Sequence, residues 1–253
     1  MALEKAKVFT VASVKGGTGK TTTLLNLAGI FSLQKKKVLI IDLDLYGGAI
    51  ALSLNIPNEQ DIYRLVDDLN SNRFEIIDRY LVKYNDYIDV IPSPKDPRNA
   101  SKIGSKYISV VLSKVIYRYD VILIDTNHFL NDITLVALDA SDQVLYVINN
   151  DPSNLKNMAT RIAIHKDMEQ DNYKIILNES THPGKEQFSK YDVKNILKEN
   201  INYVIPKNFY LKNIDKYILE GNILTLQKGI ASKYKKTIDS FKNIAESLMK
   251  DKK

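Results

Sequence analysis

Eight consecutive residues combine lysines, glycines and threonines in a pattern typical of phosphate binding: Lys15-Gly16-Gly17-Thr18-Gly19-Lys20-Thr21-Thr22. An apolar run, Val8–Val14, precedes them, and a stretch with helical spacing, Thr21–Leu33, follows. Strand, glycine loop and helix form a phosphate-binding loop, because glycines let backbone N–H groups converge on phosphate oxygens and the helix N-terminus adds its positive dipole end. We therefore expect residues 16–22 to bind a nucleotide, with Lys20 on its β- and γ-phosphates and the Thr21 hydroxyl on Mg²⁺.

The same stretch departs from the ordinary phosphate-loop pattern, G-x-x-x-x-G-K-[ST], at its first position. Val14 stands where that pattern has glycine, and a second lysine, Lys15, follows it. Lys15 is therefore more informative about the function than the residues that match the ordinary pattern, because it limits the kinds of nucleotide-binding protein that the sequence fits.

Length and composition favour one compact α/β domain over residues 1–253. The chain is 44% hydrophobic and contains only 10 glycines and 7 prolines, which is typical of a folded protein. It has no cysteine, which excludes disulfides and thiolate metal sites. We find no pattern of a signal peptide and no apolar run of about 18–20 residues that would span a membrane, so we expect a cytoplasmic protein.

Positive charge gathers at the C-terminal end of the chain, whose overall net charge is +6. Residues 228–253 contain eight lysines against Asp239, Glu246 and Asp251. Such a segment predicts contact with nucleic acid or an anionic lipid surface, and association with the nucleoid or the membrane. The alternative is a solvated helix face without a partner.

Short apolar runs alternate with segments of helical spacing along the chain. The runs are rich in β-branched residues and mostly continuous, as strands buried on both faces are; they are Val8–Val14, Val38–Ile41, Ile88–Ile91, Val121–Ile124, Val144–Ile148, Ile175–Leu177 and Tyr203–Ile205. The helical segments are Thr21–Leu33, Ser105–Tyr117, Leu155–Met168 and Tyr191–Lys198. Alternation of this kind predicts a doubly wound, mainly parallel sheet with helices on both faces.

Carboxylates follow two of these runs. Asp42 and Asp44 come after Val38–Ile41, and Asp125 comes after Val121–Ile124. In a parallel sheet ligands bind at the carboxyl ends of the strands, where the phosphate loop also lies. We therefore expect these carboxylates to serve the metal and the attacking water, although a single Asp after a strand is often only a turn former.

With these motifs in place, the chain resembles the deviant Walker A ATPases of the ParA/MinD superfamily, which include pilus-locus CpaE/TadZ-like proteins. Their signature, Lys-Gly-Gly-x-Gly-Lys-Thr-Thr, is matched at every fixed position from Lys15 to Thr22. The similarity continues from Val38 to Asp44 and from Tyr119 to Asp125, and resumes more weakly at residues 137–142 and 204–208.

The resemblance implies a homodimer that encloses two ATP molecules and hydrolyses them slowly, with stimulation by a partner. Lys20 would hold its own nucleotide, whereas Lys15 would reach the nucleotide of the second copy. A cation there is useful because two facing triphosphates repel each other. Asp44 would orient or activate the attacking water, Asp42 would help to manage the metal and nucleophile, and Asp125 would hold Mg²⁺ through water.

Two further residues are implied in binding the adenine base. Asn178, which ends the run Lys174 to Leu177, resembles the residue that reads adenine in the family, and Pro206 lies where the family wraps the base. A helix cap or turn is an equally good interpretation of Asn178.

The sequence also departs from the pattern of partition ParA proteins. Asp44 is followed by Leu45-Tyr46 rather than Pro-Gln, and Asp125 is followed by Thr126-Asn127-His128 rather than a Pro-Pro pair. The second change lies in the loop expected to sense the γ-phosphate. His128 is interpreted as a surface-loop histidine, with a catalytic role as the alternative.

Three functions remain open: an ATPase that partitions DNA, a MinD-like or pilus-locus ATPase that positions a protein or membrane apparatus, and a nucleotide-dependent scaffold with little hydrolysis. The altered loop after Asp125 favours the second and third. A C-terminal apolar stripe bears on membrane binding, and its spacing predicts a helix that packs on the sheet. The stripe consists of Ile230, Tyr234, Ile238, Phe241, Ala245 and Leu248.

Overall fold

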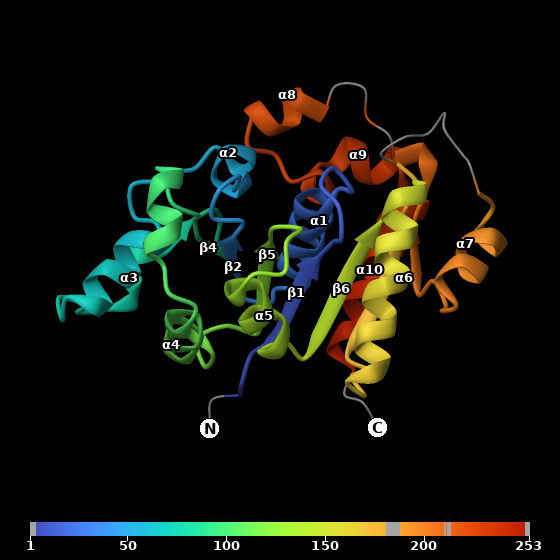
Figure 1. The fold of residues 1–253 in the computed structure, drawn as a ribbon. Coiled ribbons are helices and arrows are strands. Elements are labelled where there is room, and N and C mark those ends of the chain that lie inside the picture. Colours follow the sequence, from blue (N-terminus) through green and yellow to red (C-terminus); the bar gives the residue numbers. More distant parts are fainter. Residues whose placement is uncertain (1–3, 181–187, 210, 212–213, 251–253) are drawn as a thin grey trace.

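The computed structural model describes residues 4–180, 188–209, 211 and 214–250. Their strands form one eight-stranded sheet in the order β3-β4-β2-β5-β1-β6-β7-β8 (Figure 1). β3 pairs with β4 in the antiparallel direction, and the other neighbouring pairs are parallel. The doubly wound, mainly parallel prediction is confirmed. The strands are β1 Lys7–Ala12, β2 Val38–Leu43, β3 Val82–Lys83, β4 Ile88–Ile91, β5 Val121–Thr126, β6 Gln143–Ile148, β7 Tyr173–Asn178 and β8 Tyr203–Ile205.

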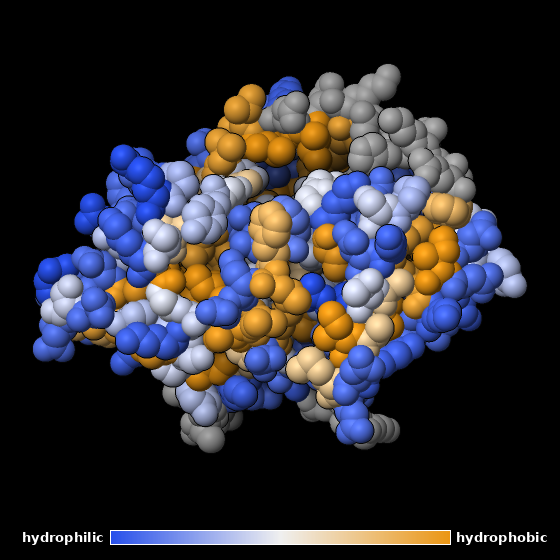
Figure 2. Space-filling model, in the orientation of Figure 1, coloured by the Kyte–Doolittle hydropathy of each residue, from blue (hydrophilic) through white to orange (hydrophobic). Residues whose placement is uncertain are grey.

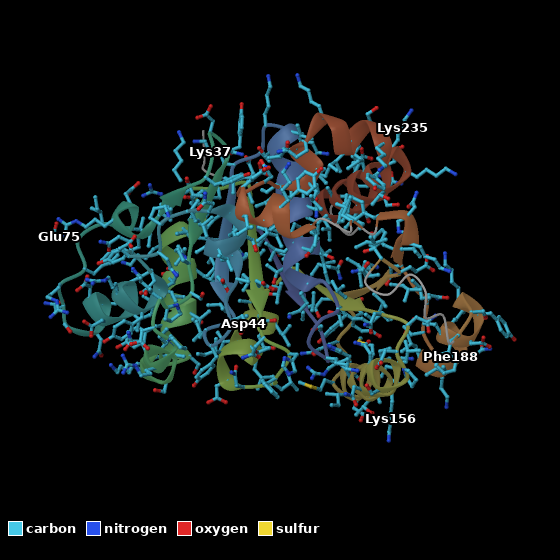
Figure 3. All side chains as sticks on the ribbon, turned by 90° about the horizontal axis from the view of Figure 1, so that it is seen from above. Lys37, Asp44, Glu75, Lys156, Phe188 and Lys235 are labelled. Atoms are coloured by element: carbon cyan, nitrogen blue, oxygen red, sulfur yellow. The ribbon has the colours of Figure 1, made fainter. Side chains whose placement is uncertain are left out.

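Helices cover both faces of the sheet. One face carries α1, α9 and α10, and the other carries α4, α5, α6 and α7. Figure 2 shows apolar residues gathered over α5 and beside α6 on the second face. The view from above separates Lys156 of α6 from Lys235 of α10 (Figure 3). The α-helices are α1 Lys20–Leu33, α2 Ile50–Leu54, α3 Ile62–Asn70, α4 Lys106–Val115, α5 Asp132–Asp139, α6 Pro152–Asp167, α7 Lys190–Leu197, α8 Ile214–Leu219, α9 Lys228–Lys233 and α10 Lys235–Met249; 3-10 turns span Ile77–Tyr80, Pro97–Lys102, Lys207–Phe209 and Leu224–Leu226.

The central strands are apolar on both sides because both sides are covered. In β1, Phe9 and Val11 pack into the cluster that includes α1 and α10, whereas Val8 packs into the cluster that includes α4. All three side chains are buried. Removing this much apolar surface from water at about 25 cal/mol per Å² is the main stabilising contribution to such a sheet. It also fixes the position of the loop that follows β1.

Four predicted strand ends are wrong, and each error concerns the site. One of them belongs to β7, which ends at Asn178 rather than Leu177. β1 ends at Ala12 rather than Val14, because the chain turns there and the Ser13 hydroxyl donates a hydrogen bond to the Lys15 carbonyl at 2.8 Å. β2 and β5 run beyond Ile41 and Ile124, so Asp42 and Asp125 lie inside the strands instead of after them. Asp42 and Asp125 are register partners on neighbouring strands. The ladder therefore holds these two backbones in place.

The C-terminal stripe is buried, as its spacing predicts, but it spans two helices. α9 and α10 meet at Tyr234, whose backbone angles, φ −113° and ψ 38°, interrupt the helix. All six stripe residues are buried against the sheet and α1, and Phe241 packs edge-on to Phe209. The lysines from 228 to 250 are exposed, while Lys252 and Lys253 lie outside the described residues. Among the described helices, none has the length and apolar character needed to cross a bilayer.

Candidate functional site

The phosphate loop connects β1 to α1 at the carboxyl edge of the sheet. Gly17 and Gly19 have φ values of 75° and 88°, in the left-handed region that glycine adopts at least cost. Gly19 caps α1, and its carbonyl accepts a hydrogen bond from the Thr23 N–H at 2.9 Å. α1 then begins at Lys20, which is buried. The loop thus presents the N-terminus of a 14-residue helix, where anions bind favourably.

Thr21 and Asp125 are in direct contact beside this loop. The Thr21 hydroxyl donates a hydrogen bond to Asp125 Oδ2 at 2.5 Å. The other carboxylate oxygen, Oδ1, is buried and has no hydrogen-bond partner among the described residues. Thr21 and Asp125 therefore offer a hydroxyl and a carboxylate, and Oδ1 of the carboxylate is available as an acceptor. Oxygen ligands of this kind suit Mg²⁺.

Burial raises the pKa values of the two strand carboxyls, and a neighbouring carboxylate adds to each rise, Asp125 for Asp42 and Asp44 for Asp125. Asp42 is fully buried, and burial first, then the charge of Asp125, raises its pKa well above the ordinary value. Burial likewise raises the pKa of Asp125 to about 6, while the Lys20 charge and the Thr21 hydroxyl lower it. Two desolvated carboxyls that repel each other are stabilised by a cation between them.

The oxygen ligands of Thr21 and Asp125 fit a Mg²⁺ ion whose remaining ligands come from a nucleotide and water. Among residues 4–180, 188–209, 211 and 214–250, no group of three or more His, Asp or Glu side chains could hold a metal by itself. Mg²⁺ commonly uses one or two protein oxygens together with phosphate oxygens and water. Thr21 and Asp125 supply such a pair next to the expected phosphates.

Asp44 lies at the exposed side of the same edge. Its backbone N–H donates to Asp42 Oδ1 at 3.1 Å, and its own Oδ1 accepts a hydrogen bond from the Gly47 N–H at 3.3 Å. Asp44 is half-buried, and the view from above shows it over the middle of the molecule (Figure 3). The carboxylate is thus anchored through its backbone while its side chain reaches solvent, as a group that orients water needs to be.

Lys15 is held inside its own chain. Its ammonium donates to Asp151 Oδ1 at 2.8 Å and to the Ser153 hydroxyl at 2.9 Å. These hydrogen bonds, with that of Lys15 contributing most, lower the pKa of Asp151. The side chains of Lys15 and Asp151 are 42% and 36% exposed, so the pair is solvated and exchangeable.

His128 lies against the phosphate loop. A Cβ atom placed on Gly16 would be 3.9 Å from both Cε1 and Nδ1 of the imidazole. Asn127 positions this segment, because its buried Oδ1 accepts hydrogen bonds from the Phe129 N–H at 2.9 Å and the Thr134 hydroxyl at 3.3 Å. The ring centroids of His128 and Phe129 are 4.0 Å apart. His128 is thus half-buried in a loop beside the phosphate loop, and both its surface-loop interpretation and the catalytic alternative stay predictions.

Asn178 and Pro206 lie together at the far edge of the site, because Asn178 of β7 is paired in register with Ile205 of β8. The Asn178 amide donates to the Thr18 carbonyl at 2.9 Å, and its Oδ1 accepts from the Ser180 N–H and hydroxyl. Asn178 thus braces the phosphate loop and forms a turn. Its contact with adenine, and that of Pro206, stay predictions.

Sequence reasoning missed Asp151, Ser153 and Asn127. A signal existed for Asp151, since Asp151-Pro152 is a typical start of a helix and Asp151 does cap α6 through the Asn154 N–H at 3.0 Å. The pairing with Lys15, 136 residues away, is visible only in the fold.

Comparison with known proteins identifies the family. Residues 6–177 match a family model described as an AAA domain. The sporulation initiation inhibitor protein Soj of Bacillus subtilis (strain 168) is 32% identical over 145 residues, which are 55% of this chain and 56% of that protein. The chain spans about half the length of the first curated relatives it matches.

Two solved structures share the fold over nearly the whole chain. A ParA family ATPase from Chlorobium tepidum TLS gives a TM-score of 0.80 at 19% identity, covering 95% of this chain and 98% of that one. The septum site-determining protein MinD of Pyrococcus horikoshii OT3, solved with Mg-ADP, gives 0.77 at 21%, covering 97% and 96%. The family match over residues 6–177 establishes that the chain belongs to the AAA-domain family, and the two solved structures show that it shares its fold with ParA and MinD ATPases.

Proposed function

We propose that this protein binds ATP with Mg²⁺ and hydrolyses it slowly, and that ATP drives it from monomer to homodimer. One observation carries the proposal: Thr21, Asp125 and Lys20 meet beneath a loop whose other lysine, Lys15, is held by a solvated ion pair with Asp151 and a hydrogen bond to Ser153. The first three residues serve a nucleotide of the same chain. Lys15 is not needed for that nucleotide, so its ammonium is available to the nucleotide of a second copy of the chain.

The residues divide the chemistry among them. Lys20 and the N-terminus of α1 bind the phosphates, and Thr21 and Asp125 hold Mg²⁺, which when bound neutralises phosphate charge. Asp44 orients the attacking water from the exposed side of the edge, and Asp42 supports it through the Asp44 N–H. In the dimer, Lys15 exchanges Asp151 for the phosphates of the second copy and reduces the repulsion between two triphosphates.

The switch is tested by measuring mass by light scattering with ATP or ADP. Lys20→Ala is expected to lose ATP binding and the dimer together, whereas Lys15→Ala is expected to bind ATP and remain monomeric. Lys36→Ala is the control, because Lys36 is also exposed and paired with an Asp, Asp120 at 3.9 Å, away from the loop. ATP-dependent dimers of Lys20→Ala, or dimerisation of Lys15→Ala equal to that of the control, would exclude this mechanism.

A second candidate function is a nucleotide-dependent scaffold with little hydrolysis. It is favoured by the Asn127 hydrogen bonds, which fix the loop after Asp125 in one conformation. Turnover in the wild type and in Asp44→Ala separates the two candidates. An ATPase loses turnover in Asp44→Ala while it keeps its ATP-bound dimer, and a scaffold shows the same low background in both proteins.

For the cargo, the exposed lysines of α9 and α10 support contact with DNA or an anionic surface, whereas the buried stripe gives membrane insertion no support. DNA affinity that depends on phosphate contacts falls steeply with salt. Lys235→Gln/Lys236→Gln is expected to weaken binding, and Lys106→Gln/Lys114→Gln on the opposite face is the control. The same pair of variants tested on anionic vesicles distinguishes a lipid surface from DNA. A protein activator is the remaining partner that the family implies.

A further inference from the structure

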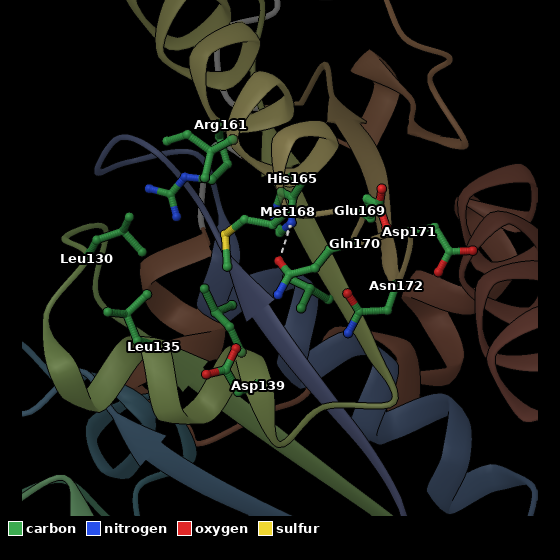
Figure 4. Close-up of a pocket in the computed structure, with 13 residues that line it drawn as sticks. Leu130, Leu135, Asp139, Arg161, His165, Met168, Glu169, Gln170, Asp171 and Asn172 are labelled. Carbon is green, nitrogen blue, oxygen red and sulfur yellow. Dashed lines mark hydrogen bonds between the residues drawn. The ribbon is translucent and has the colours of Figure 1, made fainter.

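A second concave site lies between α5 and the C-terminal half of α6, away from the phosphate loop. Its volume is about 240 Å³, and its apolar walls come from both helices and from the segment before α5 (Figure 4). Leu130 and Leu135 stand on one side and Met168 stands on the other, and Ile164 of α6 also lines the site. All four side chains are exposed although they are large and apolar. Exposed apolar side chains gathered around one groove mark an interaction surface.

The floor of this groove offers little to a small polar ligand. Both ring nitrogens of His165 already have partners: Nε2 is 2.9 Å from the Tyr146 hydroxyl, and Nδ1 is 3.0 Å from Gln170 Oε1. Tyr173 stacks on the same ring, with centroids 4.7 Å apart. The volume is also below the roughly 300–1,000 Å³ of typical small-molecule pockets and suits one or two large side chains. The occupant is therefore a protein segment.

The charges around the groove select the kind of segment. Three carboxylates, Asp139, Glu169 and Asp171, line it against one cation, Arg161. Asp139 and Glu169 are exposed at the end of the groove where α5 and α6 finish. An apolar groove between two helices accepts an amphipathic helix, and an acidic rim attracts cations beside its anchors.

We propose that the groove between α5 and α6 binds an amphipathic, basic helix of a partner protein. Leucine or aromatic anchors of that helix insert between Leu135 and Met168, and its lysines or arginines lie against Asp139 and Glu169. The proposal does not depend on nucleotide chemistry, because none of these residues belongs to the phosphate or metal site.

Binding is tested without nucleotide by fluorescence anisotropy. Two labelled peptides of about 14 residues share leucines at i, i+3, i+4 and i+7, and they carry either lysine or glutamate at the polar positions. The lysine peptide is expected to bind at least about tenfold more tightly than the glutamate peptide at low salt, and the difference is expected to shrink at high salt.

Two variants decide whether the peptide occupies this groove. Met168→Lys is expected to weaken binding of the lysine peptide about tenfold, and Leu33→Lys serves as the control, since the two residues are 60% and 58% exposed and Leu33 ends α1 on the opposite face. Asp139→Lys/Glu169→Lys is expected to reverse the preference toward the glutamate peptide. Thermal unfolding measured alongside shows that each variant is folded.

The proposal is overturned if the glutamate peptide binds as tightly as the lysine peptide, or if Met168→Lys and Leu33→Lys behave alike. Concentration-dependent self-association that Met168→Lys abolishes would also overturn it, because a second copy of this chain would then occupy the groove.

Discussion

The two lysines of the phosphate loop, five residues apart, stand in opposite surroundings. Lys20 is buried at the start of α1, between the loop and Asp125, and its position is set by the most central strands of the sheet. Lys15 is about two-fifths exposed and held by Asp151 and Ser153 of the helix that follows β6. The buried side of the site, around Lys20 and Asp125, belongs to the core. The exposed side, around Lys15 and Asp151, makes contacts that water or another anion can replace. Nucleotide binding and dimerisation are therefore separable by mutation.

The largest effect is expected from Asp125→Asn on the buried side. Even residues behind a metal ligand change metal affinity 10–100-fold, so loss of this carboxylate is expected to lower Mg²⁺-dependent ATP affinity by about 100-fold. Titration with a fluorescent ATP analogue, with Mg²⁺ and with EDTA, measures it. Asp239→Asn, an exposed carboxylate on α10, is the control. If the variant retained the full Mg²⁺ dependence, Asp125 would have no place in the metal site.

Close packing around the buried side chains of Asp42 and Ser93 is probed by Gly48→Ala. A Cβ atom on Gly48 would lie 1.9 Å from Ser93 Oγ and 2.7 Å from Asp42 Oδ2. We expect the free energy of unfolding to fall by about 1–3 kcal/mol, as overpacking of a fixed site does. Gly104→Ala is the matched control, since its new methyl group meets nothing closer than 3.7 Å. Equal denaturant midpoints for the two variants would show that this region is not rigid.

On the exposed side, Asp151→Asn removes the charge that holds Lys15. A solvated ion pair contributes about 0–1 kcal/mol, so the ATP-dependent dimer is expected to tighten by no more than about fivefold. Asp239→Asn again serves as the control, because it breaks an exposed ion pair with Lys242 far from the loop. Analytical ultracentrifugation with ATP gives the dimer constant. Weaker dimerisation would mean that Asp151 presents Lys15 to the second copy instead of competing for it.

The smallest effect is expected from His128→Ala. The imidazole packs on Gly16, and its loss is expected to weaken ATP binding by about two- to fivefold, which is less than 1.4 kcal/mol. Met168→Ala is the control, because this exposed residue lies on the same face of the sheet but lines the groove beside α5. Nucleotide titration compares the two. A change above about tenfold would place His128 among the residues that touch the phosphates.

The sequence is most informative where a function depends on neighbours in the chain. Lys20 and Thr21 follow from the loop motif, and Asp42 and Asp125 follow from their strands, because parallel strands bring their carboxyl ends to one edge. The predicted strand ends, Ile41 and Ile124, fall short of the observed ones, because an Asp after an apolar run resembles a turn residue although the ladder continues through Asp42 and Asp125. Periodicity cannot detect such pairing.

Long-range contacts and short elements were beyond reach. β3 has only two residues and α2 only five, so neither shows a period, and α5 begins at an Asn131 cap that fixes the Thr134 N–H at 2.9 Å. The groove between α5 and α6 joins residues from 130 to 172 whose apolar character is ordinary in each helix taken alone. These apolar side chains are exposed because of the way α5 and α6 are spaced in the fold, which neither helix shows in its own sequence.

The segment between β5 and α5 touches both of the sites described. His128 rests on the phosphate loop, and two residues later Leu130 forms a wall of the groove. Asn127 ties the segment to α5 by accepting a hydrogen bond from the Thr134 hydroxyl. Any free energy by which nucleotide changes groove binding must equal the free energy by which the groove ligand changes nucleotide binding. Residues 127–131 are the part of the chain that connects the two sites, and measuring nucleotide affinity with and without the groove peptide gives the size of that free energy.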